Sequence, residues 1–185
     1  EVIPFSIVDN YPTVVGDRGE ATFKIRGALF EPGTKFQLVN NSNVIAAAHL
    51  SLDDPSTAYA TFNLIGATNG SWSLRAFMNA TSIVSATLSN AVTVTSGGGS
   101  QIDFAIDGPS AVWAVFTQRI LAFYGNGGNS DAASPLLLLE GRDGTRVGSD
   151  INQLTTGTLQ LLGRSLDGPA TILRPQSSYS HAVFY

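Results

Sequence analysis

The chain has 185 residues, 43% of them hydrophobic and 13% charged, with a formal net charge of −4, which is typical of a globular protein with a core and not of a disordered chain or a charged coiled coil. Its ten basic residues provide no positive field for a nucleic acid, so we expect no nucleic-acid partner. No apolar run approaches the ~20 residues of a membrane span, so we expect no membrane insertion. The absence of cysteine excludes disulfides, Cys-based zinc sites and thiol catalysis.

The first half of the chain alternates apolar and polar residues with a period of two. Phe23 and Ile25 would face a core, while Lys24 and Arg26 would face solvent. The same alternation predicts strands over residues 21–26, 35–39, 58–64, 71–77 and 91–94, with turns at residues 16–19, 31–34, 40–43, 53–55 and 69–70. Turns every 8 to 12 residues or so indicate an antiparallel sandwich.

A Gly/Ser-rich segment near the middle of the chain has the composition of a flexible linker. It predicts a first domain over residues 1–96, a linker over 97–100 and a second domain over 101–185. Each domain has the length of a small β-sandwich. The predicted fold class is therefore all-β, with two tandem Ig-like antiparallel β-sandwiches that fold independently.

The second half shows the same strand pattern less regularly. Four consecutive leucines follow Pro135, and the run is too short for a helix, so we interpret it as a strand buried on both faces. Strands are predicted over residues 102–106, 119–124, 136–139, 157–162 and 180–185.

Two families share turn motifs with this chain. The elements Thr22–Gly27 and Phe30-Glu31-Pro32-Gly33, followed by residues 34–38, resemble the opening of bacterial-type IPT/TIG-like immunoglobulin repeats, and the resemblance covers most of residues 10–95. Residues 124–131 with Pro135, and the ending 172–179, are similar to adhesion-related modules of the CARDB kind, although Gln176 stands where that family usually has glycine. Both resemblances imply Ig-like modules of large extracellular or surface proteins, without an active site.

The sequence gives little support for a catalytic site. The two histidines, His49 and His181, fall in different predicted domains, and no Gly-x-Ser-x-Gly element is present for a serine nucleophile. Asp53 and Asp54 are adjacent, but neighbours in an extended segment point apart, and Pro55 indicates a turn. We therefore expect no enzyme activity and no cofactor.

One loop offers oxygens to a cation. Asn126, Asn129 and Asp131 form a weak candidate calcium loop, because Ca²⁺ takes six to eight oxygens and this loop supplies one carboxylate. The competing interpretation is a hairpin turn in which Asn and Gly take left-handed conformations.

Aromatic residues raise the alternative of carbohydrate binding. Trp72 alternates with Leu74 and is predicted to lie in the core, and Trp113 is predicted to be buried in or between the domains. The remaining candidates for stacking on sugar rings are Tyr11, Tyr59, Tyr124 and Tyr179.

Three Asn-x-Ser/Thr sequons, at Asn40, Asn69 and Asn79, lie near predicted turns and are candidates for N-glycosylation in a secreted protein. With the resemblances, they favour a non-catalytic structural or adhesive module of a large extracellular or cell-surface protein or filament. Its expected partners are neighbouring modules of the same or identical chains, together with glycans or surface proteins. The alternative is a carbohydrate-binding accessory region of a larger secreted enzyme.

Overall fold

The computed structural model describes residues 4–79, 81, 83–110 and 116–185, and the regular secondary structure in these ranges consists of strands alone. The predicted all-β class is thus confirmed, while Trp113 lies outside the described residues. Nowhere in the described ranges is there a helix that could cross a membrane. In chain order the strands are β1 (Ser6–Tyr11), β2 (Val14–Gly16), β3 (Glu20–Ala28), β4 (Lys35–Asn40), β5 (Asn43–Ala46), β6 (His49–Asp54), β7 (Thr57–Asn63), β8 (Gly70–Phe77), β9 (Ser85–Thr95), β10 (Ile102–Asp107), β11 (Arg119–Asn126), β12 (Ala132–Ala133), β13 (Leu136–Glu140), β14 (Arg146–Val147), β15 (Thr155–Thr156), β16 (Thr158–Leu162), β17 (Ile172–Leu173) and β18 (Ser177–Phe184).

The first half, residues 1–96, contains two sheets that share one hydrophobic cluster, an arrangement compatible with an Ig-like sandwich. One sheet has the order β1-β3-β7-β6 and the other β2-β9-β8-β4-β5. Period-two alternation turns Phe23 and Ile25 of β3 toward Leu38 of β4 and Trp72 of β8, all of which belong to this cluster. The burial predicted for Trp72 is confirmed.

Pairing in the first half departs from a purely antiparallel sandwich at one strand. β2 pairs in parallel with β9, with Val14 opposite Thr93 and Gly16 opposite Thr95. β1 pairs antiparallel with β3 in the other sheet, so the chain changes sheets between β1 and β2.

The second half, residues 101–185, has a three-stranded sheet in the order β10-β11-β18 and the two-stranded pairs β12-β17, β13-β16 and β14-β15. Tyr124 and Ala122 of β11, Leu137 of β13 and Val183 of β18 belong to a second, smaller hydrophobic cluster.

The prediction that the four-leucine strand is buried on both faces is wrong. β13 alternates, with Leu137 and Leu139 buried and Leu136 and Leu138 about 60% exposed (59% and 61%). One face of β13 therefore packs on the second cluster, and the other faces solvent.

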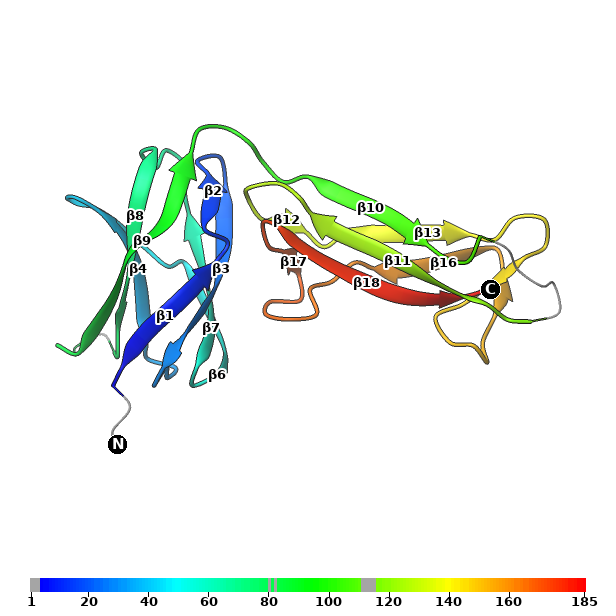
Figure 1. Cartoon of the computed structure of the whole chain (residues 1–185), viewed down its shortest axis with the longest axis horizontal. Coiled ribbons are helices and arrows are strands. Elements are labelled where there is room, and N and C mark those ends of the chain that lie inside the picture. Colours follow the sequence, from blue (N-terminus) through cyan, green and yellow to red (C-terminus); the bar gives the residue numbers. More distant parts are fainter. Residues whose placement is uncertain (1–3, 80, 82, 111–115) are drawn as a thin grey trace.

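Figure 1 shows how the two halves meet. The strands of the first half run up the page, and the second half extends sideways from them, with the loops beside β12 and β17 facing β3 and β7. The contact therefore falls on the outer face of the β1-β3-β7-β6 sheet.

Candidate functional site

The outer face of strands β3 and β7 is covered by the second half. Thr22 lies opposite Thr61, and Lys24 lies opposite Tyr59, so these four side chains share the face that points away from the first cluster. A solvent-facing position would leave them accessible, yet Tyr59 is only 1% exposed and Thr22 is fully buried. We call this contact the joint; on the side of the second half it is made by Asn129, Asp131, Asp167, Gly168, Arg174 and Gln176.

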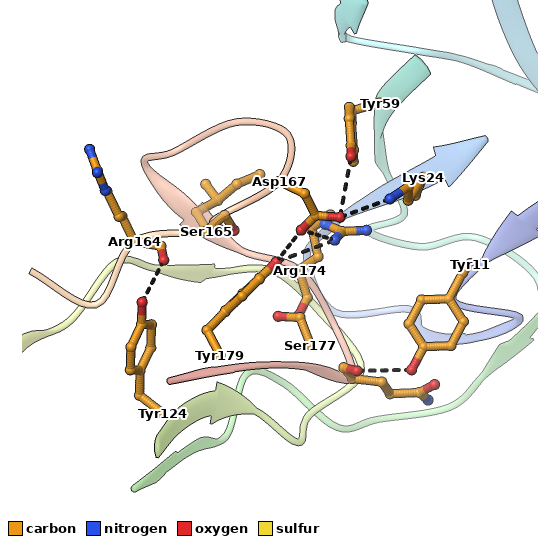
Figure 2. A network of polar contacts seen from close by, with 12 residues as sticks. Tyr11, Lys24, Tyr59, Tyr124, Arg164, Ser165, Asp167, Arg174, Ser177 and Tyr179 are labelled. Atoms are coloured by element: carbon orange, nitrogen blue, oxygen red, sulfur yellow. Dashed lines mark hydrogen bonds and ion pairs between the residues drawn. The ribbon is translucent and has the colours of Figure 1, made fainter. Parts of the chain in front are cut away.

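Asp167 is the centre of the joint (Figure 2). Its Oδ2 accepts hydrogen bonds from Lys24 Nζ at 3.1 Å and from the Tyr59 hydroxyl at 3.2 Å, both in the first half. Its Oδ1 accepts from Arg174 Nη2 and from the Tyr179 hydroxyl, each at 2.7 Å, in the second half. One carboxylate thus ties four donors from both halves together.

The charge of Asp167 is fixed by these donors. Burial alone would raise the pKa of its carboxyl, but hydrogen bonds from Tyr179 and Lys24, together with the charge of Arg174, lower the pKa to about 2. Asp167 is therefore an anion throughout the neutral range. Such a group holds cations in place and is a poor acceptor for a proton in general-base catalysis.

Arg174 lies between the two halves and is only 5% exposed. Its guanidinium carbon sits 5.1 Å from the centre of the Tyr59 ring, a cation–π geometry, while Nη2 bonds to Asp167. Its Nε is buried and has no acceptor among the described residues. A cleft of about 460 Å³ opens beside it, lined also by Tyr11, Lys24 and Asp167.

Asp131 makes a second polar contact across the joint. Its Oδ1 accepts from the Thr22 amide at 3.0 Å and its Oδ2 from the Thr22 hydroxyl at 2.7 Å, and its own amide donates to the Glu20 carbonyl at 2.7 Å. Burial raises the pKa of this carboxyl to about 6, because the bonds from Thr22 only partly replace its lost hydration.

The Gly-rich segment is hydrogen-bonded on both sides. Gly97 donates its amide to Asp17 of the first half at 2.8 Å, and Gly99 donates to the side-chain oxygen of Asn129 at 2.9 Å. The Asn129 carbonyl also accepts from the Gly16 amide at 2.8 Å. Asn129 thus connects the segment to the second half and to β2.

The three residues of the candidate calcium loop take different partners. The Asn126 side-chain oxygen accepts from the Gln101 and Gly128 amides at 3.0 Å each, and Nδ2 donates to the carbonyls of Ser130 and Leu173. Asn129 and Asp131 face the Gly-rich segment and Thr22, as described above. Within the described residues, no group of three or more His, Cys, Asp or Glu side chains is placed to hold a metal ion.

Gln176 connects to the first half through both main chain and side chain. Its carbonyl accepts from the Tyr11 hydroxyl at 2.8 Å, and its Nε2 donates to the Val14 carbonyl at 3.4 Å. Its φ is +57°, a left-handed conformation that favours glycine. This conformation is the physical reason that glycine suits this position.

Three of the aromatic candidates gather around the joint, with the Tyr124 and Tyr179 rings 5.9 Å apart, while the two histidines are placed apart. Tyr59 and Tyr179 belong to the joint, and Tyr124 is buried with its hydroxyl bonded to the Arg164 carbonyl at 2.9 Å. His49 lies exposed at the start of β6 and His181 is half-buried in β18, on different sheets.

The sequon asparagines differ in their surroundings. Asn69 is exposed in the turn before β8. Asn40 is half-buried, and its Nδ2 donates to the Ser71 carbonyl at 3.0 Å. Asn79 accepts from the Thr81 amide at 3.1 Å. The amide nitrogen that would carry a glycan is thus engaged at Asn40.

The chain matches no protein-family model, and no curated protein matches it in sequence. The joint must therefore be interpreted from its own geometry.

Sequence reasoning did not find Tyr59, Asp167 or Arg174 as a unit. Alternation placed Lys24 on an outer face, which is correct, but a period-two pattern says nothing about what covers that face. The only available signal was Asp167-Gly168-Pro169, whose composition marks a turn.

Proposed function

We propose that this chain is a non-catalytic structural module of a larger extracellular or cell-surface protein, in which the joint sets the direction between two Ig-like parts. The observation that carries the proposal is the four-donor cluster on Asp167, because it replaces a free hinge by a fixed polar contact. The IPT/TIG-like and CARDB-like turn motifs support the same conclusion. Neighbouring modules are the proposed partners.

Two features favour a stiff connection between the two halves over a flexible one. The Gly-rich segment is held by the bonds that its amides donate to Asp17 and Asn129, and the buried faces of Tyr59 and Thr22 would be exposed if the halves separated. Burial of an aromatic side chain is worth about 1.5–3 kcal/mol, enough to bias the halves toward contact.

Of the aromatic residues that suggested a carbohydrate-binding role, Trp72, Tyr59 and Tyr124 are buried and so cannot offer a stacking face. Tyr11 is 46% exposed, and its hydroxyl bonds to the Gln176 carbonyl in the joint. The proposal therefore concerns mechanical positioning.

The test is a distance measurement between the halves. The chain has no cysteine, so Val44→Cys in β5 and Leu162→Cys in β16, both exposed, give two unique sites for spin labels. We expect a narrow distance distribution by pulsed electron paramagnetic resonance. Asp167→Ala should broaden it, because Lys24 and Arg174 lose their shared acceptor.

Asp9→Ala is the matched control. It also removes an aspartate from an ion pair, with Arg26, but that pair lies within the first half. It should leave the distribution narrow. A distribution in the unmodified chain as broad as that of a free Gly/Ser linker would refute the proposal.

A further inference from the structure

β10 is an edge strand of the second half that is exposed along its whole length. Within the part of the chain that the structure describes, it hydrogen-bonds to β11 on one side and forms the outer edge of its sheet, along the upper side of the second half in Figure 1. All six of its residues are exposed. A free edge of this kind presents unpaired amides and carbonyls to another strand.

The apolar side of β10 faces the interior of the sandwich and is nevertheless open. Phe104 lies opposite Tyr124 and Ile106 opposite Ala122, so they share the face of two buried residues. Even so, Phe104 is 47% and Ile106 is 55% exposed. A cavity of about 640 Å³ lies against them, lined further by apolar residues that include Ile120 and Leu139 and, at the end of β13 and in the segment after it, by the charged residues Glu140, Arg142 and Asp143. The seam between β10 and β13 is therefore a groove with an apolar part beside a free strand edge.

The opposite face of β10 is acidic, because it carries Asp103 and Asp107. The strands at the edges of the three larger sheets, β1, β2, β5, β6, β10 and β18, contain five aspartates and no lysine or arginine. A second copy pairing through any of these edges would offer β10 no cationic partner, and through β1, β6 or β10 it would bring carboxylates near carboxylates. Charge complementarity thus favours a different, basic partner.

We propose that the β10 edge and its groove bind an extended segment of another protein that is apolar on one face and carries Lys or Arg on the other. The segment adds as a strand beside β10, places its apolar side chains in the groove, and pairs its cations with Asp103 and Asp107. This inference extends the proposed function by naming a partner, and its test makes no use of the joint.

The experiment uses the whole chain and a synthetic nine-residue peptide of alternating Val and Lys, with a Val and Glu peptide of the same length as the charge control. Binding is measured by calorimetry, and hydrogen exchange locates it. We expect the Lys peptide alone to bind and to protect those amides of β10 that point away from β11.

Two matched pairs of variants locate the site. Asp107→Lys should weaken the Lys peptide about fivefold, as expected for an exposed pair turned into a repulsion, while Asp53→Lys in β6 should not. Ile106→Ser should weaken it about tenfold, while Ile65→Ser, at a more exposed isoleucine of the first half, should not. All four positions are exposed, so folding is retained.

Three results would overturn the proposal. Equal binding of both peptides would remove the charge argument. Protection, in the free monomer, of the β10 amides that point away from β11 would mean that the chain covers this edge itself. Self-association that Ile106→Ser abolishes would identify a second copy as the occupant. A loose joint would not affect any of these readouts, so this proposal and the proposed function fail separately.

Discussion

The two halves bury their apolar residues to different extents. The cluster of the first half contains Phe23, Phe36, Phe62 and Trp72 between two sheets of four and five strands. The second cluster has Tyr124 as its one buried aromatic among the described residues and is otherwise built from alanine, leucine and valine, beside a sheet of three strands and three two-stranded pairs. The first half is thus closer to a self-sufficient sandwich.

The second half compensates at the joint. Arg174 and Gly168 pack on Tyr59, which stands outside the first cluster, so part of the second half's burial is provided by the surface of the first. A segment with the composition of a flexible linker can thus join two parts that are in contact, and the stability of one part can depend on that contact more than the stability of the other.

Separating the halves should have the largest effect. We expect residues 1–96 alone to unfold cooperatively, because their cluster is complete, and residues 101–185 alone to melt well below their transition in the whole chain. Thermal circular dichroism of both fragments checks this. Equal stability of the second half with and without the first would contradict the asymmetry.

Trp72→Ala tests the first half from within. Trp72 fills the cluster and donates its ring N–H to the Thr68 carbonyl at 3.0 Å, so truncation should cost about 3–5 kcal/mol in denaturant unfolding. Trp72→Phe keeps the ring volume in part and should cost less. An unchanged midpoint for Trp72→Ala would show that the core does not depend on it.

Gly168→Ala probes the joint through a close approach. Gly168 has φ +73°, and an added Cβ would lie 2.6 Å from the Tyr59 ring. We expect a loss of about 2 kcal/mol, of which about 1 is backbone strain and the rest steric. Gly144→Ala is the matched control, since its φ is +79° with open space around it. Equal losses for the two variants, by denaturant titration, would mean that contact with Tyr59 contributes nothing.

Asp131 should make the joint pH-dependent. Its pKa is raised from 3.8 to about 6, so its contribution is fully present below pH 3.8 and is lost as the pH rises through 6. The nearby charge of Glu20 opposes ionisation and that of Arg174 favours it. After allowance for partial exposure, the loss between pH 4 and 7 is on the order of 1 kcal/mol.

Asp131→Asn should remove this slope, because the amide oxygen can still accept from Thr22 without titrating. Asp167, whose pKa is lowered to about 2, acts in the opposite direction and only below about pH 4. Unfolding curves from pH 4 to 7 distinguish the two residues. A slope that persists in Asp131→Asn would assign it to another group.

The sequence predicted what depends on local alternation. The strand around Phe23 and Ile25 and the burial of Trp72 follow from a two-residue period, and both are found. The same rule failed for the leucines after Pro135, because a run without polar residues does not show which side chains face solvent.

The site could not be predicted in the same way. Tyr59 and Thr22 stand at polar-face positions, and only the three-dimensional contact with Asp167 and Asp131 explains their burial. The groove at β10 was equally hidden, because alternation predicts an inward face for Phe104 and does not reveal that the opposing layer leaves it open.

Gln176→Gly should have the smallest effect, and its sign is informative. Gln176 adopts φ +57°, which costs a residue with a side chain about 1 kcal/mol relative to glycine in the folded state, but glycine also gives the unfolded chain more freedom. The variant loses the 3.4 Å bond from Nε2 to the Val14 carbonyl, a long and exposed contact, and keeps the bond that the Gln176 carbonyl accepts from Tyr11. We therefore expect a gain in unfolding free energy of less than about 1 kcal/mol, measured by denaturant titration. A clear loss would show that the Gln176 side chain holds β2 to the second half. The free energy that this contact contributes would then exceed the backbone strain that glycine relieves.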